Sequence, residues 1–119
     1  MVTFTDVKTI LNNIMQGSQN TLGHKVNLVN KHAEPSFPDF YGDFTNAQLQ
    51  AAKARGLQLI QPEVLPPPGQ VGTTGDQANI VQALKGLLPL VRQMPGGGPV
   101  MSDPDIATIV DWINHGCPD

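Results

Sequence analysis

Acid–base chemistry is the first possibility that the residue types raise. Asp39 and Asp43 lie four residues apart, with Tyr41 between them and His32 a short way upstream. These groups could transfer protons if a cleft brought them together. They could equally be solvated side chains of a loop, since no nucleophile elbow, phosphate-binding loop or His-Glu-x-x-His motif occurs in the chain. The motifs therefore favour a protein that is not an enzyme without deciding the matter.

A few imidazole and sulfur side chains could bind a metal. His24 and His32 are separated by eight positions, which corresponds to no metal-binding motif. His115 falls at the expected end of a helix, where a partial positive charge is favoured. Cys117 is the only cysteine, which excludes an internal disulfide and a cysteine cage. No metal site is predicted.

The first and last helices have the clearest patterns. Apolar residues at helical spacing predict a helix over residues 5–16, which Gly17 can end. A second stripe predicts a helix that Ser102 caps and Gly116 ends, with Pro104 tolerated in its first turn. The two stripes consist of Val7, Ile10, Leu11, Ile14, Met15, Ile106, Ile109, Val110 and Ile113.

Two more helices are expected between them. A Thr-x-x-Gln capping box at Thr45 predicts a helix that Gly56 closes. A third helix is predicted over about 77–86, with Asp76 as its cap. The proline- and glycine-rich stretch 62–75 should form an extended surface loop. No convincing strand pair is found, so the predicted class is all-α, with about four short helices joined by long loops.

Length and charge restrict the possible functions. The 119 residues fit a single domain, 1–119. The net charge of −3 and the lack of a Lys/Arg cluster argue against nucleic acid as a partner. No apolar run reaches the roughly 18–20 residues that span a bilayer. The N-terminus lacks the pattern of a signal peptide, so the expected location is the cytoplasm, or the periplasm if a signal peptide was removed.

Three C-terminal segments form a specific pattern, because their residue types, their spacing and their positions on the expected last helix all agree. They are Gln-Met-Pro-Gly-Gly-Gly-Pro at 93–99, Ser-Asp-Pro-Asp-Ile at 102–106 and Asp-Trp-Ile-Asn-His-Gly-Cys-Pro at 111–118. This part of the chain resembles the end of a class I cytochrome c domain of the bacterial kind, and Val-Lys-Thr-Ile-Leu at 7–11 resembles the first helix of that family. The resemblance implies a cytochrome c-like fold, in which Met94 would occupy the position of the distal iron ligand.

The chain departs from that family at the haem-attachment motif. In the family the first helix leads into Cys-x-x-Cys-His, whose thiols bond the haem vinyl groups and whose histidine ligates the iron. Counted without gaps from the first helix, Met15 and Ser18 stand where the cysteines would be, and Gln19 stands where the histidine would be. We call these three positions the degenerate haem slot. Covalent haem is therefore excluded.

The space that a haem fills in this family could be closed or occupied in three ways in this chain. The core could collapse around Met15, Met94, Met101 and the aromatic residues of 37–44. A small hydrophobic ligand could occupy the space. Haem could also bind without a covalent link, through Met94 and His24 or His32. The expectation is that the protein carries no cofactor, with non-covalent haem as the alternative.

The resemblance implies a function for such a haem-free domain. It would be an interaction module that binds a protein partner, such as a redox or biosynthetic enzyme, through the family's haem-edge face at 15–24 and 93–99. The alternatives are an electron-transfer protein with non-covalent haem, a small enzyme or ligand-binding protein that uses the vacated pocket near Asp39, and a structural accessory subunit.

Overall fold

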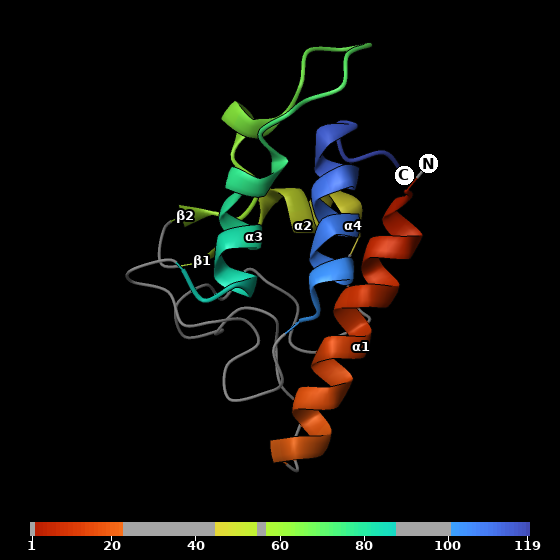
Figure 1. The fold of residues 1–119 in the computed structure, drawn as a ribbon, viewed down its shortest axis with the longest axis vertical. Helices are drawn as coiled ribbons and strands as arrows, with labels where there is room; N and C mark the ends of the chain where they lie inside the picture. The colour runs from red at the N-terminus through yellow and green to blue at the C-terminus, as the bar shows by residue number, and fades with distance from the viewer. Residues whose placement is uncertain (1, 23–44, 55–56, 88–100) are drawn as a thin grey trace.

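The structure, a computed structural model, describes residues 2–22, 45–54, 57–87 and 101–119, with only the backbone described for residues 15–22, 53–54 and 57. Within this part of the chain there are four α-helices: α1 (Phe4–Leu22), α2 (Asn46–Ala51), α3 (Asn79–Leu84) and α4 (Asp103–Asn114). Two 3-10 turns, η1 (Pro62–Val64) and η2 (Gly75–Gln77), lie between α2 and α3. The mostly helical architecture confirms the predicted all-α class (Figure 1).

The helix α1 is longer than the sequence pattern predicts. It begins at Phe4, where Thr3 and Asp6 bind each other's backbone N–H groups, and it continues through Gly17 to Leu22. The prediction that Gly17 ends the helix is therefore wrong. A glycine inside a helix costs only about 1 kcal/mol relative to alanine, which is too little to stop a helix that its neighbours continue.

The start of α2 agrees with the prediction and its end does not. Thr45 Oγ1 accepts a hydrogen bond from Gln48 N at 3.1 Å, and Gln48 Oε1 accepts one from Thr45 N at 2.8 Å, which is the predicted capping box. The helix ends at Ala51, well before Gly56. The chain then turns into the short antiparallel pair β1 (Lys53–Ala54) and β2 (Leu57–Gln58), a strand pair that the sequence did not predict.

The beginning of α3 depends on a residue far from it in the sequence. Asp76, the predicted cap, lies in η2, and Ala78 occupies the N-cap position without a side-chain hydrogen bond. The side chain of Gln61 replaces the cap, because its Oε1 accepts a hydrogen bond from Asn79 N at 2.9 Å. Ile80 N also donates to Leu59 O at 2.7 Å, so the chain before η1 is fixed against the start of α3.

The helix α4 ends as the sequence predicts. Gly116 has a φ of +83°, and its N–H donates to Ile113 O at 2.9 Å. Cys117 N donates to Trp112 O at 3.1 Å. These two bonds form a Schellman motif, and the burial of Cys117 and Trp112 gives the apolar contact that accompanies it. Ser102 is the N-cap residue, although its side chain makes no capping hydrogen bond.

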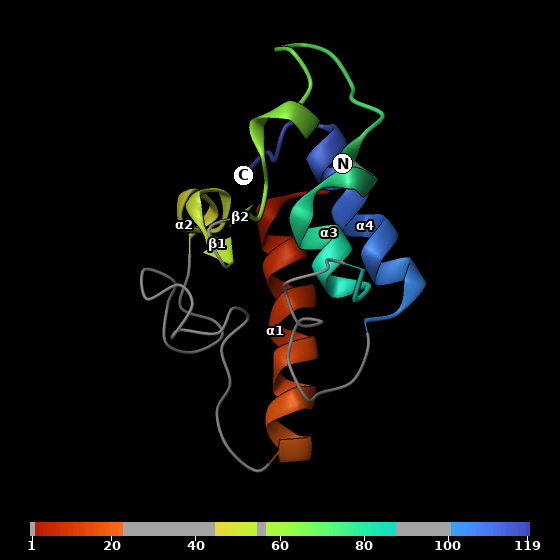
Figure 2. The ribbon, with the colours of Figure 1, turned by 90° about the vertical axis from the view of Figure 1, so that its left-hand side faces the viewer.

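The core forms where α1, α3 and α4 meet the chain between α2 and η1. The helices α1 and α4 lie antiparallel and side by side, and α1 extends beyond the first turn of α4 (Figures 1 and 2). The fully buried large side chains belong to one cluster: Val7, Leu11, Leu49, Leu59, Ile60, Ile80, Leu84, Ile109, Trp112 and Ile113. None of the described helices is both long and apolar enough to span a bilayer.

Candidate functional site

The degenerate haem slot lies on the second half of α1. Val7 and Leu11, one turn apart, are fully buried and mark the face through which α1 packs. Position 15 is the next position on that face, and positions 18 and 19 follow it at i+3 and i+4. All three positions therefore share one face of the second half of α1. This half of the helix extends past α4 in both ribbon views (Figures 1 and 2).

An unpaired polar atom lies one turn before the slot. Asn12 Oδ1 is buried and accepts no hydrogen bond from the described residues. Position 12 is three residues before position 15, so the two are neighbours along the helix surface. A buried acceptor without a partner costs about 1–3 kcal/mol, which makes this amide a candidate acceptor for a donor from a bound molecule.

The only thiol of the chain lies far from the slot. Cys117 follows α4 and is fixed to Trp112 by the Schellman motif, and the Trp112 ring lies 6.1 Å from the Phe4 ring at the start of α1. Position 15 is eleven residues further along α1, a rise of about 16 Å. The thiol is also 4% exposed. The thiol therefore lies out of reach of the slot positions on α1.

Burial also controls the chemistry of this thiol. Removal from water raises the pKa of Cys117 from 9.0 to about 12, because the thiolate loses its hydration. The thiolate is the reactive form of cysteine, so a native thiol with this pKa is inert near neutral pH. Cys117 is a core residue of the α4 terminus, and no redox or nucleophilic role follows from it.

The shifted pKa gives a pH-dependent stability. Between pH 9 and 12 the unfolded chain releases the Cys117 proton while the native state keeps it, so the free energy of unfolding falls as the pH rises. The slope contributed by this group is at most about 1.4 kcal/mol per pH unit. Denaturant titrations at several pH values should show this slope, and Cys117→Ser should lack it. Equal slopes in the two proteins would refute the assignment.

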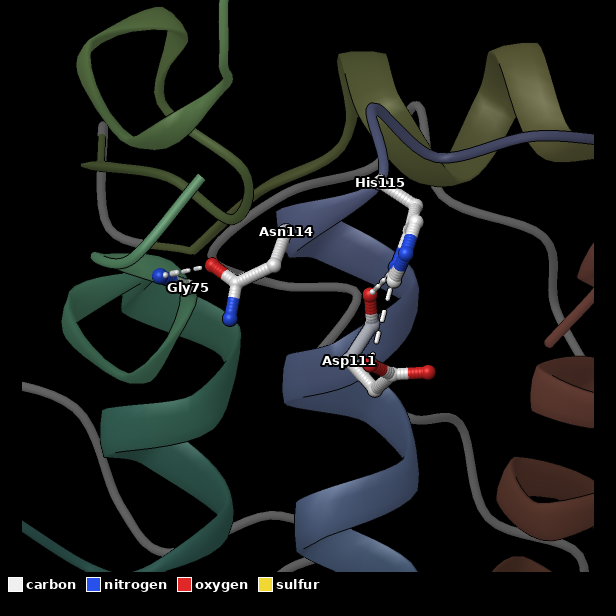
Figure 3. A network of polar contacts seen from close by, with 4 residues as sticks. All are labelled: Gly75, Asp111, Asn114 and His115. Carbon is white, nitrogen blue, oxygen red and sulfur yellow. Dashed lines mark hydrogen bonds and ion pairs between the residues drawn. The ribbon is translucent and has the colours of Figure 1, made fainter. Parts of the chain in front are cut away.

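The end of α4 holds the loop before α3 in place. Asn114 Oδ1 accepts a hydrogen bond from Gly75 N at 2.8 Å (Figure 3). Asn114 O accepts a second one from Gly72 N at 2.6 Å. His115 Nδ1 lies 2.8 Å from Asp111 O and 3.5 Å from a carboxylate oxygen of Asp111. These contacts are structural, and His115 occupies the helix-terminal position that the sequence indicates.

The contact between α4 and the loop before α3 leaves no room for a side chain at Gly75. A Cβ atom there would lie 2.7 Å from both Val110 O and Asn114 Oδ1. We expect Gly75→Ala to lower the free energy of unfolding by about 1–3 kcal/mol, because the loop must move away from α4. At Gly72 a Cβ would make ordinary contacts of 3.4–3.5 Å, so Gly72→Ala serves as the control in the same urea titrations. An equal loss in both variants would contradict this explanation.

Several candidate residues lie outside the part of the chain that the structure describes. These are His24, His32, Asp39, Tyr41, Asp43 and Met94. Met101 is described and is 3% exposed, in the same core cluster as Trp112. Among the described side chains, no three His, Cys, Asp or Glu residues come together to hold a metal ion.

Sequence reasoning missed the residues that make long-range polar contacts. Asn114, Gln61 and Asn46 each bind backbone or side-chain groups far away in the sequence, and Asn46 Nδ2 donates to Cys117 O at 3.0 Å. The only sequence signal was the paired glycines at 72 and 75, which permit a close approach of the backbone.

Comparisons of the chain with protein-family models, curated proteins and solved structures find no match.

Proposed function

We propose that the protein is a haem-free domain with a cytochrome c-like fold that acts as an interaction module beside a redox or biosynthetic enzyme. The observation that carries the proposal is the joint loss of both thiols and the imidazole from one face of α1, at Met15, Ser18 and Gln19. Two thioether bonds and an iron ligand are thereby lost together. The remaining thiol, that of Cys117, is buried at the end of α4 and cannot form such a bond at the slot.

The intact packing of α1 and the intact ends of α4 support a binding role for the domain. Val7 and Leu11 remain fully buried on the slot face, and α4 keeps its N-terminal Ser-Asp-Pro and its Schellman end. Asn12 Oδ1, one turn before the slot, is buried and receives no hydrogen bond from the described residues. The proposed docking surface is the haem-edge face that the resemblance implies at 15–24 and 93–99, of which residues 23, 24 and 93–99 lie outside the described part of the chain.

Native mass spectrometry of the protein from its own source tests the proposal. The expected species contains the 12.7 kDa chain and a second protein, with no porphyrin. Gln19→Arg, which adds a long charged side chain at the slot, should weaken that complex about tenfold or more. Ala107→Arg, at an exposed position of α4, is the matched control and should leave the complex intact. A chain that carries haem, or that has no partner, would contradict the proposal.

A further inference from the structure

The loop between η1 and η2 projects from the end of the molecule opposite to the last turns of α1 (Figures 1 and 2). We refer to residues 65–71 of this loop as the proline arm. Its outer part is exposed at Pro67, Pro68 and Gln70, and Val71 is 64% exposed, the highest value among the large apolar side chains described. The arm thus presents proline rings and an aliphatic side chain to solvent.

The backbone of the arm is preorganised. Leu65 has φ −82° and ψ 138°, close to polyproline II values. Leu65, Pro66 and Pro67 each precede a proline, which restricts them to extended conformations, and the proline rings fix φ near −65°. Residues 65–67 therefore form a short polyproline II segment. It leads into a turn at Pro68 and Gly69, where the φ of Gly69 is +80°.

A turn and two contacts fix the position of the arm. Gln70 N donates to Pro67 O at 3.1 Å, and with Pro68 and Gly69 at its centre this is a type II turn. At the base, Gly72 N donates to Asn114 O, and a Cβ on Gly72 would lie 3.4 Å from Pro66 Cβ. The two limbs of the arm therefore lie against each other and against the end of α4.

The composition of the arm indicates the chemistry of its partner. The stretch 64–75 has no charged residue, in a chain with 17 of them, so charge pairing cannot provide the recognition. A rigid polyproline II segment with an aliphatic neighbour fits a groove lined by aromatic side chains, which packs on proline rings without counter-charges. Such a segment loses little conformational entropy on binding, since its backbone is already fixed.

We infer that the proline arm is a docking element that inserts Pro67, Pro68 and Val71 into an aromatic-lined groove of a partner protein. The inference rests on the proposed interaction function and adds a second contact surface to it. The arm and the degenerate haem slot lie at opposite ends of the long axis, so a partner could contact one end without covering the other.

Site-specific photo-crosslinking in the source cell tests the inference. A benzoylphenylalanine at position 71 should give one discrete adduct with a different protein, cross-linked beside a tryptophan or tyrosine. The same probe at Ala107, an exposed position on α4, is the control and should give none. The double variant Pro67→Ala/Pro68→Ala should lower the yield of the adduct about tenfold, because it removes the backbone restriction. The variant should still fold, with a melting temperature lower by several degrees, because each Pro→Ala change costs about 0.4–1 kcal/mol through the unfolded chain.

Four results would overturn the inference. Position 71 could give no adduct, or position 107 could give an equal amount of adduct. The adduct could have twice the mass of the chain and so come from a second copy, or its yield could be the same in the Pro67→Ala/Pro68→Ala variant. These failures differ from failure of the proposed function. If native mass spectrometry shows a complex while position 71 gives no adduct, the arm is wrong and the interaction module stands. If native mass spectrometry shows no complex, the proposed function fails.

Discussion

The triple variant Met15→Cys/Ser18→Cys/Gln19→His is expected to become a covalent haem protein. The substitutions place two thiols and an imidazole at positions i, i+3 and i+4 of one face of α1. If the frame is cytochrome c-like, this face borders the haem site, and only these three groups are missing. The test is expression in cells that attach haem to Cys-x-x-Cys-His, followed by denaturing mass spectrometry and haem staining.

Two companion variants make this experiment specific. Met15→Cys/Ser18→Cys keeps Gln19 and lacks the iron ligand, so it should acquire far less haem than the triple variant. Adding Met94→Ala to the triple variant should leave the covalent haem in place and remove the sixth iron ligand, which changes the visible spectrum. A triple variant that folds, as judged by circular dichroism, but takes up no haem would contradict the cytochrome c-like frame.

Trp112→Ala is expected to cause the largest loss of stability of any single substitution considered, about 3–5 kcal/mol. The Trp112 side chain is fully buried, its ring lies 6.1 Å from the Phe4 ring, and its Nε1 donates to Pro118 O at 2.8 Å. The substitution therefore leaves a cavity between α1 and α4 and frees the chain after Cys117. For a domain whose total stability is about 5–15 kcal/mol, this loss brings the protein close to unfolding.

Two controls separate the contributions of Trp112. Trp112→Phe retains an aromatic ring and loses the Nε1 donor, so it should cost clearly less than Trp112→Ala in urea titrations. Val71→Ala removes an exposed side chain and should change the free energy of unfolding by less than about 0.5 kcal/mol. A cost for Trp112→Ala as small as that of Val71→Ala would show that α1 and α4 do not pack through this residue.

The sequence predicts elements whose signals are local. The apolar stripe of α1, the Thr45 capping box and the glycine that ends α4 all depend on residues within one or two turns of each other, and the structure contains all three. The burial of Ile109 and Ile113 follows from the same periodicity. The slot positions on α1 could be placed for this reason, since they continue the stripe that Val7 and Leu11 begin.

The errors arise where distant contacts outweigh local preference. The alanines after Leu49 favour helix, but the chain leaves α2 at Ala52, whose carbonyl accepts a hydrogen bond from Leu59 N at 2.9 Å. Asp76 is a good cap by composition, but Gln61, fifteen residues earlier, performs that task for α3. The contact between Asn114 and Gly75 spans 39 residues. No local pattern contains these pairings, so sequence periodicity could not reveal them.

A visible absorption spectrum of the purified protein, followed by a titration with haemin, tests most directly whether this chain works without iron porphyrin. The expected result is no Soret band in the isolated protein and no saturable band on addition of haemin, with His24→Ala and Met94→Ala indistinguishable from the unchanged protein. A tight Soret band that disappears in either variant would contradict a haem-free module and would identify the protein as an electron carrier with non-covalent haem.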